Sequence, residues 1–171
     1  MTAIIEFLLS IINIFKCWEI LDAYEKGVML RFGKYKKTLD AGIHFMLPFY
    51  IDQVLSDNVV PTTDKLWQQS LETADKKSIV ITSIIFWKII DIKKILLEVE
   101  DSDSVLESIA YSVISEQVSM QNWEYIQSDE FADDCNDAIN CQAKKYGIEV
   151  LKTCFIDKAM ITSIRLLGIG S

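Results

Sequence analysis

Thiols, one imidazole and clustered carboxylates are the side chains of this 171-residue chain that could do chemistry. A tetrahedral zinc site is built from closely spaced cysteines and histidines, but the chain has no C-x-x-C pair and His44 is its only histidine. The pattern therefore predicts free, partly buried thiols in a reducing compartment. The four cysteines are Cys17, Cys135, Cys141 and Cys154.

The remaining candidates for chemistry are weak. His44 has no base or nucleophile close to it in the sequence, so we predict a structural hydrogen bond for its ring. Asp133, Asp134 and Asp137 suggest a calcium site, but no loop has the spacing of an EF-hand. Without a nucleophile–base pair, a phosphate-binding loop or a metal cluster, the sequence predicts no enzyme, no cofactor and no metal.

Composition points towards a membrane and away from nucleic acid. Net charge is −8 and the isoelectric point is about 4.7, so the chain as a whole would repel phosphate. Half of the residues are hydrophobic and the mean hydropathy is +0.21, which is apolar for a soluble domain. Much of this excess lies in residues 3–15.

Residues 3–15 predict an amphipathic helix. The polar residues recur at steps of three and four, so a helix would place them on one narrow stripe. Thirteen residues rise only about 20 Å at roughly 1.5 Å per residue, against a hydrocarbon core of about 30 Å. We therefore predict a helix in the membrane interface; the alternative is a helix packed against protein. The residues expected to meet lipid are Ile4, Ile5, Phe7, Leu8, Leu9, Ile11, Ile12, Ile14 and Phe15, with Trp18 at the headgroup level.

A basic cluster follows, although the chain is acidic. Each basic residue near an anionic membrane gains about 1 kcal/mol, so the cluster is a candidate for binding lipid headgroups. The alternative is a solvated hairpin edge whose lysines block edge pairing, and the sequence favours neither. The cluster consists of Lys26, Arg31, Lys34, Lys36 and Lys37.

Strands and turns must position these residues. Branched and aromatic residues predict strands over 18–25 and 28–33, separated by a turn at 25–27. Val28, Leu30 and Phe32 alternate with Met29, Arg31 and Gly33, which predicts one buried and one half-polar face. Gly42 opens a second turn before an apolar stretch that reaches residue 49.

The run over residues 23–35, followed by A-G-I-H-F-M-L-P-F over 41–49, resembles the opening signature of the SPFH (band 7) domain. Stomatins, prohibitins and flotillins share this domain. In the family the segment is usually written P-G-x-H-F-x-x-P and contributes to the membrane-facing edge; here Ala41 replaces the first proline. The resemblance implies that Phe45, Leu47, Pro48 and Phe49 form a membrane-inserted tip. The residues alone fit a hydrophobic core loop equally well.

The resemblance extends through the rest of the chain. A β-branched strand is predicted over 78–90, and helices over 102–120 and after the N-cap Ser128. The last strand is predicted over 148–156, with a short helix from about Ala159. Thr73-Ala74-Asp75 and the return strand Y-G-I-E-V are similar to the second subdomain of the family.

The resemblance implies an α+β fold. It predicts a membrane-associating apolar helix (1–16), a small, mostly antiparallel β subdomain (17–72), an α/β subdomain (73–158) and a short tail (159–171). Because no long charged coiled coil follows the last strand, we expect a short form of the kind associated with bacteria and phages.

The function implied by the resemblance is a membrane-associated scaffold that organises a membrane patch or a membrane protein. Its partners would be copies of itself in a ring, the lipid membrane and a membrane protease that it restrains, with no nucleic acid. The reduced cysteines favour the cytoplasmic face of the membrane. The alternative is a monotopic adaptor or inhibitor, of viral origin, that binds a host membrane protein or a host ring.

Overall fold

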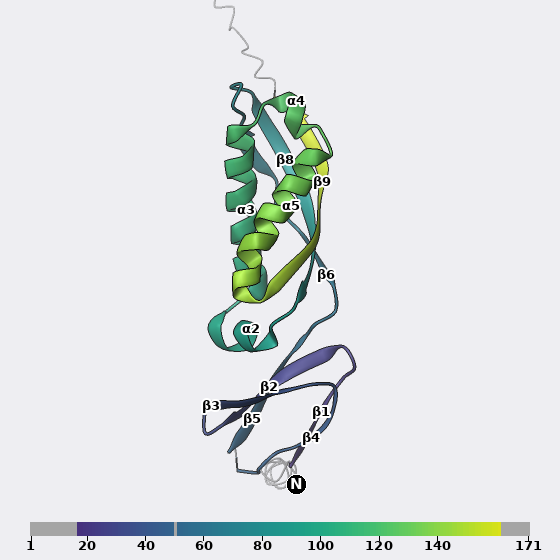
Figure 1. The fold of residues 1–171 in the computed structure, drawn as a ribbon, viewed down its shortest axis with the longest axis vertical. Helices are drawn as coiled ribbons and strands as arrows, with labels where there is room; N and C mark the ends of the chain where they lie inside the picture. Colours follow the sequence, from purple (N-terminus) through teal and green to yellow (C-terminus); the bar gives the residue numbers. More distant parts are fainter. Residues whose placement is uncertain (1–16, 50, 162–171) are drawn as a thin grey trace, which may run out of the picture. The chain divides into compact units, whose positions relative to one another are not determined.

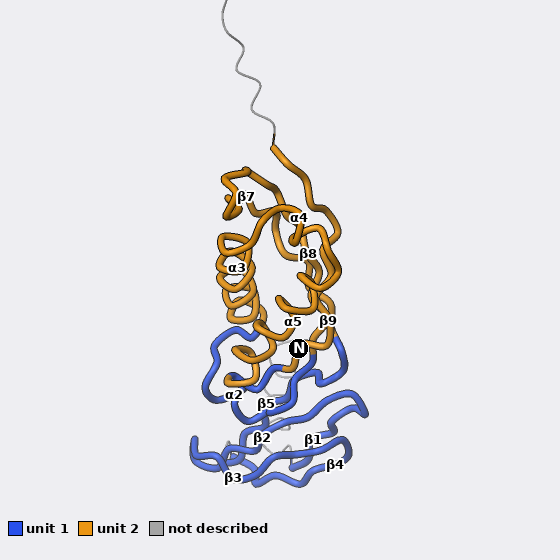
Figure 2. Tube along the Cα trace, turned by 45° about the horizontal axis from the view of Figure 1, so that its top comes forward, with its two compact units in different colours: residues 1–61, 88–102, 146–148 blue, residues 62–87, 103–145, 149–171 orange. Residues whose placement is uncertain are grey.

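The computed structural model describes residues 17–49 and 51–161 (Figure 1). Antiparallel strands and helices make up these residues, which confirms the α+β class. The chain divides into two compact units, shown in blue and orange in Figure 2. Unit 1 comprises residues 1–61, 88–102 and 146–148; unit 2 comprises residues 62–87, 103–145 and 149–171. The helix predicted over 1–16 lies outside the described residues.

Unit 1 contains two small antiparallel sheets. In the first, β2 (Glu25–Arg31) lies between β3 (Lys34–Leu39) and β5 (Asp52–Asn58). In the second, β1 (Trp18–Leu21) pairs with β4 (Gly42–Phe45) to form a two-stranded ribbon. The two sheets enclose a small core of Leu21, Met29 and Leu39, against which Met46 and Val54 pack.

The centre of β2 is buried on both sides. Met29 belongs to the core beneath the ribbon, while Val28, which faces the other way, is also fully buried. Helix α2 (Ile92–Glu98), which the sequence did not predict, belongs to the same unit and packs against β2 and β5. The prediction that only one face of β2 is buried is therefore wrong, and Phe32, placed on that face, is exposed.

The predicted turn at Glu25–Gly27 is also wrong. The chain turns earlier, where the Glu25 amide donates to the Asp22 carbonyl at 3.0 Å, and Gly27 is a buried residue inside β2. A side-chain carbon on Gly27 would lie 2.6 Å from the Leu55 carbonyl oxygen of β5. Gly27 is thus required for the close approach of β2 and β5 and not for a turn.

Unit 2 is a sheet covered on one face by helices. Strand β8 (Ser78–Ile89) pairs antiparallel with both β6 (Thr62–Lys65) and β7 (Gln69–Glu72). Its other edge is occupied by β9 (Ile148–Met160). Helix α3 (Ser102–Met120) has the bounds predicted from the sequence.

Helices α3 and α5 (Glu130–Ala143) lie together on one side of this sheet, with the short α4 (Trp123–Ile126) between them in the chain (Figure 1). Odd-numbered residues of β8 are buried beneath the helices and even-numbered residues are half exposed or exposed. The 3₁₀ helix η1 (Lys144–Tyr146) follows α5. Strand β9 continues to Met160, so the short helix predicted to begin at about Ala159 is wrong at its start.

The Thr73-Ala74-Asp75 motif ties the β7–β8 turn to α4. The Asp75 carboxylate lies 2.7 Å from the Lys77 ammonium, and it accepts hydrogen bonds from the Thr73 hydroxyl at 2.5 Å and from the Trp123 amide at 3.2 Å. Lys77 first, and then Thr73, lower the pKa of Asp75 to about 2. The motif is therefore explained by a structural role at this turn.

Candidate functional site

The ribbon of unit 1 exposes a continuous apolar face. Its register places Trp18 opposite Phe45 and Ile20 opposite Ile43. Directly opposite residues lie on the same face of a two-stranded sheet, so these four side chains form one surface, which we call the ribbon face. They are exposed to 53%, 80%, 60% and 64%, in the order Trp18, Phe45, Ile20, Ile43.

The opposite side of the ribbon explains why these side chains are outside. Leu21 is buried in the unit 1 core, and strand alternation then turns Ile20 outwards. His44 also lies on the inner side, where its Nε2 donates to the Asp40 carbonyl oxygen at 2.6 Å. The structural hydrogen bond predicted for His44 is confirmed.

Two turns of unit 1 expose further large apolar side chains. The β2–β3 hairpin turns at Phe32-Gly33, and the loop after β4 contains Leu47 and Phe49. These three large side chains, which we call the tip, are exposed to 76% (Phe32), 44% (Leu47) and 58% (Phe49). The two turns are adjacent, because the Phe32 amide donates to the Ile51 carbonyl at 2.9 Å.

Both phenylalanines occupy a left-handed backbone conformation. Phe32 has φ 51° and Phe49 has φ 65°. This region costs a bulky residue roughly 1–2 kcal/mol, and glycine or asparagine normally occupies it. Positive φ at both Phe32 and Gly33 (φ 73°) is the pattern of a hairpin turn that favours Asn-Gly. The chain thus holds two exposed aromatic rings in strained positions, which is typical of functional surfaces.

An ion pair holds the two turns of the tip in place. Arg31 Nε and Nη2 donate to the two carboxylate oxygens of Asp52 at 2.6 and 2.7 Å. The Asp52 side chain is fully buried and also accepts from the Leu47 amide at 3.0 Å. Arg31 is the main cause that lowers the pKa of Asp52 to about 2. The pair therefore links the end of β2 to the loop that carries Leu47 and Phe49.

The predicted basic cluster divides into engaged and exposed members. Arg31 is committed to Asp52, and Lys26 forms a 3.0 Å ion pair with Asp40. Three lysines remain exposed on β3, an edge strand that starts beside the Phe32 turn. Headgroup binding and protection of a sheet edge both remain predictions for them. They are Lys34, Lys36 and Lys37.

The structure thus brings the predicted tip residues and Trp18 together in unit 1. Trp18, Phe45, Leu47 and Phe49 are exposed, whereas Pro48 is half-buried. The sequence-based selection missed Ile20, Ile43 and Phe32. Alternation within residues 18–21 and 42–45 could have revealed the first two, but nothing in the sequence distinguishes Phe32 from a strand residue. The predicted lipid contacts from Ile4 to Phe15 lie outside the described residues.

Other features of the described residues offer little for chemistry. None of the four cysteines forms a disulfide. Cys135 is buried, so desolvation raises the pKa of its thiol to about 12. Within residues 17–49 and 51–161, no group of three or more His, Cys, Asp and Glu side chains could hold a metal ion. No helix in these same ranges is long and apolar enough to cross a membrane.

Comparison with known proteins gives a family match over most of the chain. Residues 19–165 match the family described as SPFH domain / Band 7 family. The Acanthamoeba polyphaga mimivirus protein R614, which carries the band 7 family name, is 21% identical over 141 residues, or 81% of this chain and 46% of that protein.

Two further relatives match shorter stretches. An uncharacterized protein of Methanocaldococcus jannaschii is 27% identical over 107 residues, which is 63% of this chain and 53% of that protein. Protein HflC of Buchnera aphidicola subsp. Schizaphis graminum is 31% identical over 86 residues, 46% of this chain and 28% of that protein. The chain spans about half or less of the length of these curated relatives.

Proposed function

This chain belongs to the SPFH domain / Band 7 family, and on that premise we propose that it is a membrane-associated oligomeric scaffold. Unit 1 would dock on lipid through the ribbon face and the tip. Copies of the chain would associate side by side and organise a membrane patch or a membrane protein. No step of this function requires catalysis.

The exposed apolar surface of unit 1 is the observation that carries this proposal. Moving one large apolar side chain from water into an apolar medium contributes up to about 1.5–3 kcal/mol. The ribbon face and the tip together offer seven such side chains, and most of their surface is in water in the described structure. Contiguous exposed patches of this kind mark interaction sites, and the strained phenylalanines argue that their exposure is selected.

Charge adds a preference for anionic lipid. Lys34, Lys36 and Lys37 are exposed on the strand that begins at the Phe32 turn. Each would contribute about 1 kcal/mol close to an anionic surface, and salt would weaken this contribution. The exposed lysines and the apolar tip would favour the same orientation of unit 1 on a membrane.

The proposal also includes a client protein and a cellular location. A relative is named HflC, and restraint of a membrane protease is the role that we propose for the assembled scaffold. We place the described units on the cytoplasmic face, where free cysteines such as the exposed Cys141 persist. Self-association, the membrane and a membrane protease are therefore the proposed partners.

Two measurements test the proposal together. Cosedimentation of the full chain with anionic and neutral vesicles is expected to show binding that is stronger with anionic lipid and weaker at high salt. Electron microscopy of detergent-extracted protein is expected to show large closed particles. A chain that stays in the supernatant with every lipid composition would refute membrane docking, and small uniform particles would favour a monotopic adaptor.

The substitution Phe32→Asn is expected to separate stability from membrane binding. Asn-Gly suits the hairpin turn, so removing the left-handed phenylalanine should stabilise unit 1 by about 1 kcal/mol and raise its melting temperature by a few degrees. Vesicle binding should weaken by roughly tenfold, because an exposed aromatic ring is lost from the tip. Thermal unfolding and vesicle titration measure the two effects.

The matched control is Ile156→Asn on β9 of unit 2, where Ile156 is exposed to 54%. This variant should leave vesicle binding unchanged. If Phe32→Asn binds vesicles as well as the original chain, Phe32 does not contact lipid. If it melts at a lower temperature, the left-handed conformation is not a source of strain.

A further inference from the structure

The sheet of unit 2 has one face that no helix covers. Both long helices lie on the other side of this sheet (Figure 1). Even-numbered residues of β8 point away from the helices, because the odd-numbered residues of β8 are buried. The resulting apolar stripe is bordered by Lys65, which lies opposite Ile84 in the register of β6 and β8. The open sheet face, as we call it, consists of Lys65, Val80, Thr82, Ile84 and Phe86.

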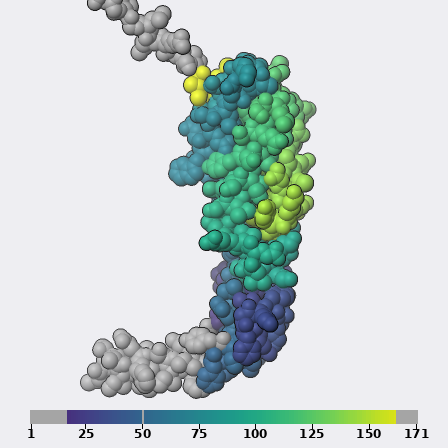
Figure 3. Space-filling model, turned by 90° about the vertical axis from the view of Figure 1, so that its left-hand side faces the viewer, coloured from purple at the N-terminus to yellow at the C-terminus, as the bar shows by residue number. Residues whose placement is uncertain are grey.

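An exposed tryptophan adjoins this face. Trp67 is 77% exposed in the β6–β7 connection, and its amide donates to the Tyr111 hydroxyl of α3 at 2.7 Å. Trp67 and Gln68 line a hollow of about 480 Å³ together with Lys65, Leu66 and Thr82. Figure 3 shows the β6–β7 connection, in the blue of residues near 67 on the colour bar, projecting from the body of unit 2. The open sheet face thus combines an apolar stripe, a projecting ring and a lysine.

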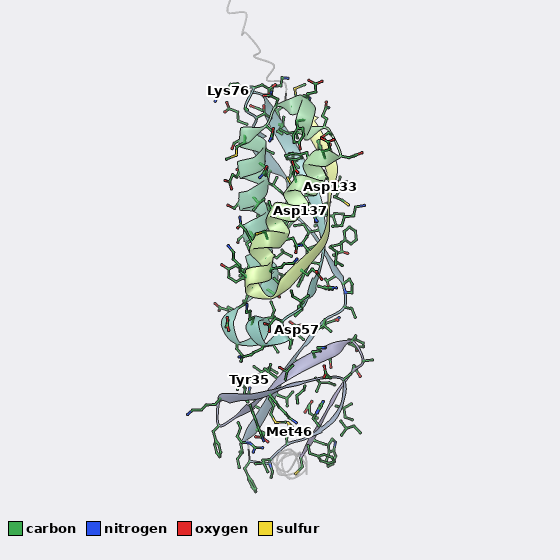
Figure 4. All side chains as sticks on the ribbon, in the orientation of Figure 1. Tyr35, Met46, Asp57, Lys76, Asp133 and Asp137 are labelled. Carbon is green, nitrogen blue, oxygen red and sulfur yellow. The ribbon has the colours of Figure 1, made fainter. Side chains whose placement is uncertain are left out.

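The helical face of the same unit has the complementary character. Neither α3 nor α5 contains a lysine or arginine, and both expose carboxylates, among them Asp133 and Asp137, labelled on α5 in Figure 4. Glu116 is an exposed carboxylate of α3. The exposed serines of α3 recur at steps of three and four, so they form one stripe along the helix. This stripe carries only short side chains. The serines are Ser104, Ser108, Ser112, Ser115 and Ser119.

We propose that the open sheet face of unit 2 binds the exposed side of α3 in a second copy of this chain. Trp67 and Phe86 would lie along the serines of the neighbouring α3, and Lys65 would face its carboxylates. This inference rests on the assembly part of the proposed function and names the surfaces that form it. The two surfaces differ and lie on one unit, so each copy offers both and the contact is head-to-tail.

Charge argues for a second copy as the occupant. The described helices provide an acidic, low surface, while the apolar stripe on the sheet is bordered by Lys65, so each surface matches the other better than itself. A pair of helical faces, in contrast, would place carboxylates together. Repeated head-to-tail contacts either close into a ring or continue as a filament.

Cross-linking of variants with one accessible cysteine, in which only the buried Cys135 is kept, tests the contact directly. In the full chain with Cys17, Cys141 and Cys154 replaced by serine, one variant carries Gln68→Cys and the other carries Ser112→Cys. A short bis-maleimide is expected to join the two when they are co-expressed, and to join neither variant to itself. A chain that carries both cysteines is expected to give a ladder of multimers.

A second set of variants tests the chemistry of the contact. Trp67→Ala should lower the yield of the cross-link by roughly tenfold, as expected for an aromatic anchor. Lys65→Glu should lower it as well, and Glu116→Lys in the partner copy should restore part of the loss. Lys76→Ala, at an exposed position of the β7–β8 turn outside both surfaces, is the control and should change nothing.

The outcomes distinguish this inference from the membrane proposal. Cross-linking of the Gln68→Cys variant to itself would overturn the head-to-tail contact. A failure of Gln68→Cys and Ser112→Cys to cross-link with each other while large particles persist would overturn it as well. Particles that never exceed one copy would overturn the contact and the scaffold, even if vesicle binding is retained. Loss of vesicle binding with intact cross-links would refute the membrane proposal and leave the contact standing.

Discussion

Replacing Trp18 and Phe45 together by serine is expected to lower vesicle binding by roughly 100-fold. The two rings lie opposite each other on the ribbon face and are mostly in water, so insertion into lipid would remove much of their surface from water. A loss of about 1.5 kcal/mol for each side chain amounts to about 3 kcal/mol, or about two orders of magnitude in the partition coefficient. Vesicle titration of the full chain measures this change.

The control removes two exposed apolar side chains from unit 2. Leu151→Ser with Ile156→Ser changes residues of β9 that are 43% and 54% exposed. This double variant should bind vesicles as the original chain does. If both double variants lose binding equally, the effect is not specific to the ribbon face and the assignment of that surface is wrong.

Replacing Asp52 by alanine is expected to destabilise unit 1 by about 3 kcal/mol. The substitution removes a fully buried carboxylate, deprives Arg31 of both its hydrogen bonds and leaves the Leu47 amide without an acceptor. The free energy of unfolding, measured with denaturant, reports the loss. Because the pair also holds the tip, vesicle binding should weaken in the same variant.

Acid should reveal the same ion pair. Asp52 has a pKa of about 2 in the folded chain, below the ordinary value of 3.8. A carboxylate whose pKa is lowered by folding contributes stability above its unfolded pKa, and this contribution is lost as pH falls through the folded value. Between about pH 4 and pH 2 the original chain should therefore lose more stability in unit 1 than Asp52→Ala does.

Asp40→Ala provides the control for charge removal. Asp40 is an exposed carboxylate paired with Lys26, and such surface pairs contribute at most about 1 kcal/mol. An equal loss of stability in Asp40→Ala and Asp52→Ala would show that the buried pair has no special role.

The sequence predicted unit 2 more accurately than unit 1, for a physical reason. Strand β8 and helix α3 are long, and each repeats its apolar residues with one period, so their bounds followed from the pattern. In unit 1 the strands contain four to seven residues, and β2 is buried on both sides. Such a short strand loses the alternation that reveals a buried face, which explains the misplaced turn at Gly27 and the exposed Phe32.

The candidate site was predicted in part. Trp18 could be selected because it follows the apolar stretch of residues 3–15, and Phe45, Leu47 and Phe49 because their segment resembles the opening signature of the family. The partner of Arg31 could not be predicted from the sequence. Asp52 lies 21 residues further along the chain and meets Arg31 only when β5 pairs with β2. The left-handed backbone conformation of the two phenylalanines could not be predicted either, because no sequence pattern indicates strain at a phenylalanine.

Depth-dependent quenching of a fluorophore tests the central claim most directly. The full chain, with its exposed or half-buried cysteines replaced, would carry a dye at Leu47→Cys in the tip or at Leu151→Cys in β9, positions of equal exposure (44% and 43%). On vesicles with nitroxide-labelled acyl chains, we predict strong quenching at position 47 and none at position 151. Vesicle-bound protein that shows no quenching at position 47 would contradict membrane docking through unit 1.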